Sequence, residues 1–143
     1  MDQRINFLSL GVADLERSAA FYEALGWTAA SYGAGQGVVF FQMNGIVFGL
    51  YPLDDLAALT GLPAAPASGF RGVTMSYNTG SPAEVDAIVA QVIAAGGRLL
   101  AAAAPAAWGG YLAVFADPDG HAWEVYHNPT WAIREDGSVQ LPH

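Results

Sequence analysis

The chain has 143 residues, of which 53% are hydrophobic and 13% are charged, a composition typical of a folded globular protein rather than of a disordered one. Its formal net charge of −8 argues against nucleic acids and anionic membranes as partners, because both are bound through basic patches. The chain has no cysteine and no lysine, which excludes thiolate nucleophiles, disulfides, sulfur-ligated metals and lysine Schiff bases.

The acidity has two explanations that the sequence leaves open. It favours a cationic ligand, or it serves only to keep an apolar protein soluble. The start of the chain, MDQRINF, has no apolar segment behind a basic one, and no apolar stretch reaches the roughly 18 residues of a spanning helix. Together with the absence of cysteine, these features predict a cytoplasmic protein.

Residues 5–51 predict a strand, a helix and three further strands. The helix is expected to begin after Asp14, a good N-cap residue, because apolar residues such as Leu15 and Tyr22 follow at helical spacing. Gly26 is expected to end it, since a residue free to adopt positive φ is needed there. The three strands that follow are predicted from the runs WTAASYG, GVVFFQM and GIVFGLY.

Residues 52–70 are rich in Pro, Gly and Ala and predict a linker with one short helical piece. Residues 72–127 then repeat the order of strand, helix and three strands. Ser81-Pro82 with Glu84 forms a capping box at the start of the second helix, and Gly96 is expected to end it. The repeated order predicts two paired modules, and ligands commonly bind where such halves face each other.

Asp117-Pro118-Asp119-Gly120 predicts a sharp turn between the last two strands of the second module. In the strand that follows, Glu124 and Tyr126 share one face. His121 and His127 lie on the other face. A metal site built from these two histidines and Glu124 is therefore not expected, because a regular strand directs them apart.

The run LGVADLERSAAFYEALGW, the second module and the run FADPDGHAWEVYHNP together resemble the vicinal-oxygen-chelate superfamily. This is the group of glyoxalase I, bleomycin-resistance proteins, fosfomycin-resistance transferases and extradiol dioxygenases. The resemblance implies an α+β fold in which two tandem βαβββ modules form a cup-shaped mixed sheet with the helices outside. The single domain, 1–143, would comprise module 1 at about 4–51, the linker 52–70, module 2 at about 71–128 and a tail, 129–143.

In the metal-bearing members of this superfamily, a divalent ion lies in the cup. The positions of its four ligands, carried over by resemblance, fall on Phe7, Gly49, Gly72 and Glu124. Only Glu124 offers a donor atom, whereas a tight divalent site needs three or four protein ligands. The expectation is therefore a protein that holds no metal and no other cofactor.

Strand alternation, combined with the resemblance, predicts which side chains face the cup. The loop Trp108-Gly109-Gly110-Tyr111 would add aromatic rings at its mouth. For Tyr51 and Tyr126 an alternative stays open, in which they close the core with the hydroxyl in water. The expected ligand-binding residues are Phe7, Ser9, Tyr51, Thr74, Trp108, Tyr111, Glu124 and Tyr126.

Two classes of function follow from the resemblance. The first is metal-independent binding of a small aromatic or cationic molecule, as in the drug-sequestering members. The second is a lyase, isomerase or dioxygenase that uses Glu124 as a catalytic base or as a metal ligand. Apolar strands such as GVVFF also predict a further sheet surface to cover, and hence a homodimer.

Overall fold

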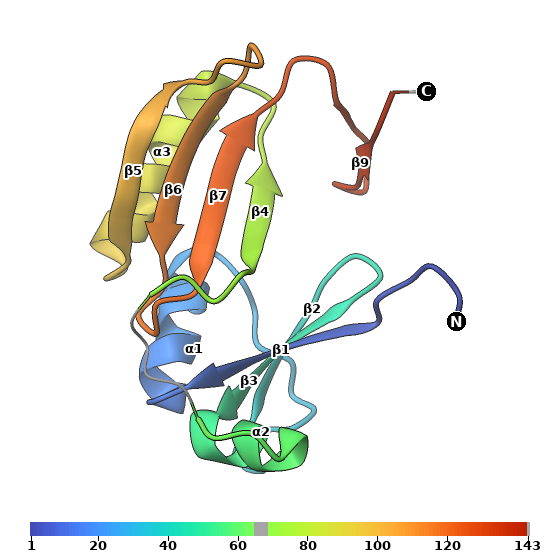
Figure 1. The fold of residues 1–143 in the computed structure, drawn as a ribbon, viewed down its shortest axis with the longest axis vertical. Coiled ribbons are helices and arrows are strands. Elements are labelled where there is room, and N and C mark those ends of the chain that lie inside the picture. Colours follow the sequence, from blue (N-terminus) through green and yellow to red (C-terminus); the bar gives the residue numbers. More distant parts are fainter. Residues whose placement is uncertain (65–68, 143) are drawn as a thin grey trace. The chain divides into compact units, whose positions relative to one another are not determined.

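The computed structural model describes residues 1–64 and 69–142, and it divides the chain into two compact units, Met1–Pro66 and Ala67–His143. Each unit contains a mixed β-sheet and at least one helix, so the predicted α+β class is confirmed (Figure 1). No helix in the described part of the chain is both long and apolar enough to cross a membrane. The two units are described separately below.

The first unit has a three-stranded sheet in the order β1-β3-β2. Strand β1 runs parallel to β3, and β2 runs antiparallel to β3. The Asp14 carboxylate accepts a hydrogen bond from the Arg17 backbone N–H at 3.0 Å, which confirms the predicted N-cap of the first helix. The elements are β1 (Phe7–Val12), α1 (Leu15–Ala24), β2 (Val39–Gln42), β3 (Val47–Pro52) and α2 (Leu53–Thr60).

The strand predicted from WTAASYG is largely wrong. It is reduced to one isolated bridge between Ala29 and Phe41, with the Ala30 N–H donating to the Phe40 carbonyl. The chain then turns through residues 31–37, where three glycines have φ between 76° and 89°. Repeated left-handed backbone cannot continue an extended strand, so the pairing ends after one bridge.

The second unit contains the complete version of the same motif. Its main sheet has the order β4-β7-β6-β5, with β4 parallel to β7, and Ser81 caps its helix as predicted. The tail forms a short hairpin around a turn at Asp136-Gly137. The elements are β4 (Thr74–Asn78), α3 (Pro82–Ala94), β5 (Arg98–Pro105), β6 (Tyr111–Ala116), β7 (Ala122–His127), β8 (Ala132–Ile133) and β9 (Val139–Gln140).

The cores of the two units differ in chemistry. In the first unit, Tyr22 of α1 stacks on Trp27 at 4.8 Å and contacts the rings of Phe41 and Phe48, so this core is largely aromatic. In the second unit, aliphatic side chains of α3 pack on the sheet formed by β5, β6 and β7. Trp123 is buried there and stacks on Phe115, as expected of a core residue. The opposite sheet faces carry most of the predicted site residues.

Candidate functional site

Glu124 lies in the middle of β7, on the face of the second unit's sheet opposite to the core. It pairs in register with Ser76 of β4 on one side and with Val114 of β6 on the other. The Ser76 hydroxyl donates a hydrogen bond to Glu124 Oε2 at 3.2 Å. The neighbours of Glu124 along the strand, Trp123 and Val125, are buried in the core, which agrees with the predicted alternation.

Glu124 is half-buried, and Ser76 is its hydrogen-bond partner within the described part of the chain. No Arg or His side chain there lies within ion-pair distance of it. Its carboxylate is therefore held by a neutral hydroxyl and has no basic partner among the described residues. Such a group can accept further hydrogen bonds or attract a cation.

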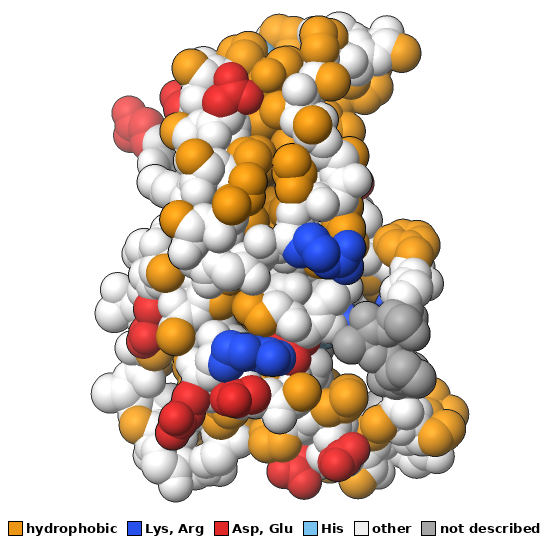
Figure 2. Space-filling model, turned by 90° about the vertical axis from the view of Figure 1, so that its left-hand side faces the viewer, with side chains coloured by type: hydrophobic (Ala, Val, Ile, Leu, Met, Phe, Trp, Pro, Cys, Tyr) orange, Lys and Arg blue, Asp and Glu red, His pale blue; other side chains and the backbone are white. Residues whose placement is uncertain are grey.

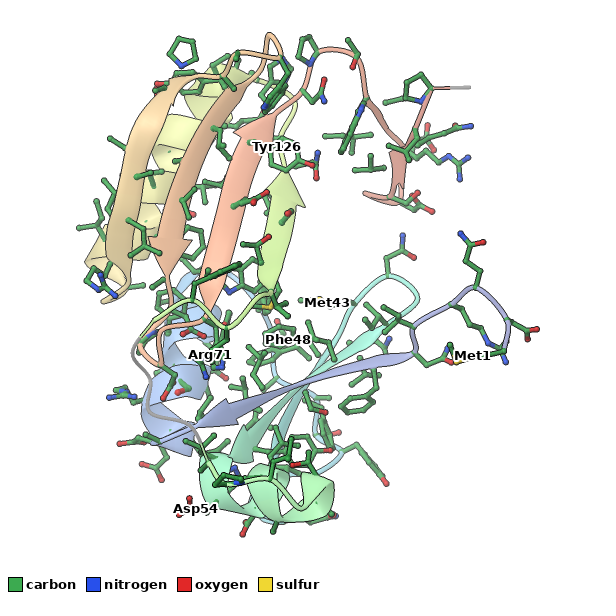
Figure 3. The ribbon with its side chains drawn as sticks, in the orientation of Figure 1. Met1, Met43, Phe48, Asp54, Arg71 and Tyr126 are labelled. Carbon is green, nitrogen blue, oxygen red and sulfur yellow. The ribbon has the colours of Figure 1, made fainter. Side chains whose placement is uncertain are left out.

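Three aromatic rings lie at the C-terminal end of β7. Tyr126, labelled in Figure 3, lies two residues beyond Glu124 and contacts both of the other rings. Its centroid is 5.9 Å from that of Trp108, with the ring planes at 81°, and 5.9 Å from that of Trp131, with the planes at 70°. Trp108 is 50% exposed, and the other two rings are half-buried, so the group is accessible from solvent.

Two glycines set the position of Trp108. Gly109 has φ of 90°, a left-handed conformation that turns the chain sharply between β5 and β6. At Gly110, the Trp108 indole and the His127 carbonyl occupy the space that a Cβ atom would need. Any side chain at position 110 would displace the indole, so the Gly-Gly pair is required to hold this ring beside Tyr126.

Tyr111 lies on the other face of the sheet, apart from Glu124. Its hydroxyl donates a hydrogen bond to Asp86 Oδ1 of α3 at 3.0 Å, and this bond raises the pKa of Tyr111 above its ordinary value. Tyr111 is the first residue of β6 and shares a face of this strand with the buried Ala113 and Phe115, so its side chain points toward α3. The structure therefore does not bring Tyr111 together with the other predicted site residues.

The two histidines beside Glu124 are engaged elsewhere, as strand alternation predicts. His121 Nδ1 is 2.9 Å from the Asp117 carboxylate, within the turn that joins β6 and β7. His127 Nδ1 is 3.1 Å from the Thr79 carbonyl. Among the residues that the structure describes, no group of three or more His, Asp or Glu side chains is arranged to hold a metal ion.

In the first unit, Phe7, Ser9 and Tyr51 share one face of the sheet with Gly49, which is opposite Ser9 in register. The Phe7 ring meets Phe40 at 5.4 Å and 90°, and Phe40 lies 5.9 Å from Tyr51. A Cβ atom at Gly49 would lie 2.7 Å from the Phe7 ring and 3.0 Å from the Tyr51 ring. Aromatic rings therefore cover the position of Gly49.

The registers also correct one ligand position taken from the resemblance. Phe7 is two residues before Ser9, which is opposite Gly49; Thr74 is two residues before Ser76, which is opposite Glu124. Thr74, rather than Gly72, is thus the counterpart of Phe7, and Gly72 lies outside the strand. Thr74 lies on the same sheet face as Glu124.

The residues at the four positions do not fit a divalent metal ion. Phe7 places a hydrocarbon ring over Gly49, so the first unit offers no donor atom there. The second unit offers the Glu124 carboxylate and, at most, the neutral Thr74 hydroxyl. This is fewer than the three or four protein ligands of a tight divalent site.

Ser76 and Trp131 were absent from the predicted set of site residues. The alternation of β4 already placed Ser76 on the same face as Thr74, but only the register shows that it is opposite Glu124. Trp131 follows Asn128-Pro129 in an irregular segment, where no periodicity links it to Tyr126. Its contact with Tyr126 depends on the turn at Asn128, whose side chain accepts hydrogen bonds from Thr130.

Residues 4–125 match the family model of the Glyoxalase/Bleomycin resistance protein/Dioxygenase superfamily. The chain belongs to this superfamily. A crystal structure of a glyoxalase-related enzyme from Fulvimarina pelagi is 35% identical, with a TM-score of 0.88 over 99% of both chains. A glyoxalase/bleomycin resistance protein/dioxygenase from Nocardioides is 29% identical, with a TM-score of 0.72 over 89% of this chain and 84% of that one.

A lactoylglutathione lyase from Agrobacterium tumefaciens is 22% identical, with a TM-score of 0.64 over 89% of this chain and 95% of that chain. At this identity the likeness concerns the fold alone. A comparison with curated proteins finds no match. Membership of the superfamily is thus established, and the activity has to be inferred from the site.

Proposed function

We propose that this protein binds a small aromatic or cationic molecule on the sheet face of the second unit that carries Glu124, without a metal ion. The observation that supports this most directly is the pairing of Glu124 with a neutral hydroxyl beside three exposed or half-buried aromatic rings. The rings offer apolar contact area, and the carboxylate offers one charged hydrogen-bond acceptor.

The charge of the protein supports a cationic or hydrogen-bond-donating ligand. The net charge of −8 attracts cations to the surface, and Glu124 has no basic partner in the described part of the chain. A half-buried carboxylate loses part of its hydration, and one hydrogen bond from Ser76 replaces only some of it, so a ligand cation or N–H donor there would be favourable.

Catalysis through Glu124 is the alternative function. A lyase, isomerase or dioxygenase of this superfamily would use Glu124 as a base or as a metal ligand. As a metal ligand it lacks the partners counted above. As a base it would act on a substrate held against the same aromatic rings, so both functions share the binding step.

The proposal is tested by a thermal-shift screen of small aromatic, cationic and dicarbonyl compounds on the wild-type protein, Glu124→Gln and Glu23→Gln. Glu124→Gln keeps the shape and removes the charge, and we expect it to weaken cationic ligands by at least about fivefold. Glu23→Gln makes the same change of net charge at an exposed position of α1 and controls for long-range electrostatics. If ligands stabilise all three proteins equally, Glu124 is not the anchor.

The absence of a metal is tested separately by elemental analysis of the purified protein. We expect no stoichiometric transition metal. About one equivalent of Zn, Ni, Mn or Fe that is lost in Glu124→Gln would contradict the proposal and support a metal-dependent enzyme instead.

The homodimer and the cytoplasmic location are parts of the same proposal. Strand β5 is an edge strand with exposed Leu99 and Leu100 and a run of largely exposed alanines. Figure 2, viewed from the β5 side of Figure 1, shows hydrophobic side chains gathered over this part of the unit. Apolar edge strands favour pairing with another chain. Light scattering that gives 14.9 kDa at micromolar concentration would contradict a dimer.

The lack of cysteine supports a cytoplasmic location.

A further inference from the structure

We propose that the ring cluster Trp108, Tyr126 and Trp131, together with Glu124, binds a methylated ammonium group, such as the trimethylammonium head of a choline-like molecule. This inference rests on the proposed function and names the class of its ligand. It is carried by the angles and distances between the rings and by the place of the carboxylate.

The ring planes stand steeply to one another. Trp108 and Trp131 meet the plane of Tyr126 at 81° and 70°, with both centroids 5.9 Å from its centroid. The rings of aromatic cages that bind methylated ammonium ions likewise meet at steep angles. Two of the three rings are tryptophans, which give the strongest cation–π attraction.

The carboxylate lies on the same sheet face as the Tyr126 ring and can balance the charge of a cation bound there. Glu124 and Tyr126 are two residues apart on the same face of β7, which separates their Cα atoms by about 7 Å. A cation within ~6 Å of the ring centroids is therefore also close to the Glu124 side chain. The carboxylate is half-buried, so water screens this attraction less than at a fully exposed position.

The surroundings favour a methylated ammonium over a primary one. A primary ammonium has three N–H donors, each of which needs an acceptor. Glu124 already accepts one hydrogen bond from Ser76 and can meet only part of this demand, while the ring faces offer no conventional acceptor. A quaternary ammonium needs no acceptor, because its charge is spread over methyl groups that pack against the rings.

The site is held in place before a ligand arrives. Trp108 lies over Gly110, and a side chain at position 110 would take the space of its indole. The turn at Asn128 positions Trp131 in the segment between β7 and β8. Because these rings are fixed by the backbone, little conformational freedom is lost on binding.

The test measures binding of choline and of its neutral isostere, 3,3-dimethylbutan-1-ol, to the wild-type protein by calorimetry and by indole NMR shifts. The two probes have nearly the same shape and differ in charge. We expect choline to bind at least about tenfold more tightly, with shifts at the Trp108 and Trp131 indoles. Equal binding of both probes, or no binding of choline at millimolar concentration, would overturn the inference.

Variants locate the site. We expect Trp108→Leu and Trp131→Leu each to weaken choline binding at least about threefold, and Glu124→Gln at least about fivefold. Tyr32→Leu removes an exposed ring of the first unit and should leave binding unchanged. Circular dichroism establishes that each variant is folded, and a Trp108 variant that binds choline like the wild-type protein would contradict the site.

The outcomes separate this inference from the proposed function. If choline does not bind but other compounds depend on Glu124 in the thermal-shift screen, the methylated ammonium is wrong and the binding function stands. If no compound in either experiment depends on Glu124, both fail.

Discussion

The two units place different chemistry at corresponding positions of the same motif. In the first unit Ser9 is opposite Gly49, and in the second Ser76 is opposite Glu124. Aromatic rings cover Gly49, whereas the Glu124 carboxylate accepts a hydrogen bond from the Ser76 hydroxyl. A single position on the central strand thus decides whether the sheet face is closed by hydrocarbon or left with a charge.

The tyrosines at the next matching position show the same divergence. Tyr51 and Tyr126 each follow two residues after Gly49 and Glu124 on the same face. Tyr51 joins the rings that cover Gly49, while Tyr126 is flanked by Trp108 and Trp131. Two related modules can therefore differ in use, with a hydrophobic surface on one and a candidate site at the matching positions of the other.

The largest expected effect concerns the aromatic core of the first unit. Phe48 is 1% exposed and contacts the rings of Tyr22, Trp27 and Phe41. We expect Phe48→Ala to lower the free energy of unfolding by about 3–5 kcal/mol, from lost apolar burial and a cavity. Val125→Ala, in the aliphatic core of the second unit, should cost about 2 kcal/mol.

Urea unfolding of both variants measures this difference. A Val125→Ala loss equal to or larger than that of Phe48→Ala would mean that the aromatic core is not the more sensitive one. Hydrogen exchange then shows which strands each substitution loosens, β1 and β3 for Phe48→Ala and β6 and β7 for Val125→Ala.

The parts of the fold that the sequence predicts well are those set by local chemistry. Asp14 and Ser81 cap their helices because each supplies a side-chain oxygen to backbone N–H groups three residues away. The alternation that places Glu124 and Tyr126 on one face follows from strand geometry alone. The absence of a strand after Trp27 was not predicted, because the effect of three spaced glycines on pairing depends on their φ angles.

The site was less predictable because its contacts join distant segments. Trp131 reaches Tyr126 across a turn, and Ser76 reaches Glu124 from a strand 48 residues earlier. Tyr111 was expected beside the loop rings, but the pairing that begins at this residue places it on the α3 side. Whether a residue opens a strand or closes a loop decides its face, and such boundaries are the least certain part of a sequence prediction.

The second prediction tests whether the rings over Gly49 are as tightly packed as the distances indicate. Gly49→Ala would place a Cβ atom 2.7 Å from Phe7 and 3.2 Å from Phe40, so the rings must shift. We expect a loss of about 1–3 kcal/mol in the free energy of unfolding. Gly80→Ala is the matched control, because its Cβ would come no closer than 3.4 Å to Glu84, and it should change stability by less than about 1 kcal/mol.

A double variant sharpens this test. Phe7→Ala removes the ring nearest to Gly49, and Phe7 is itself 42% exposed. If crowding causes the loss, Gly49→Ala should cost less in the Phe7→Ala background than in the wild-type protein. Additive effects of the two substitutions would show that the Phe7 ring does not limit position 49.

The smallest expected effect concerns how α3 is tied to its sheet, a polar contact that contrasts with the aromatic packing of α1. The hydrogen bond to Asp86, together with burial and the nearby negative charge, raises the pKa of Tyr111 above its ordinary value of 10.0. Because the folded-state pKa is the higher one, the contact stabilises the protein fully below pH ~10 and is lost as pH rises through the folded-state pKa. The stability difference between the wild-type protein and Tyr111→Phe should therefore be small, constant near neutral pH and smaller above pH ~10.

Asp86→Asn should lower the pKa of Tyr111 toward its ordinary value in a spectrophotometric titration. An unchanged phenol titration in Asp86→Asn would show that Asp86 does not hold the Tyr111 proton, and α3 would then rest on its aliphatic contacts alone.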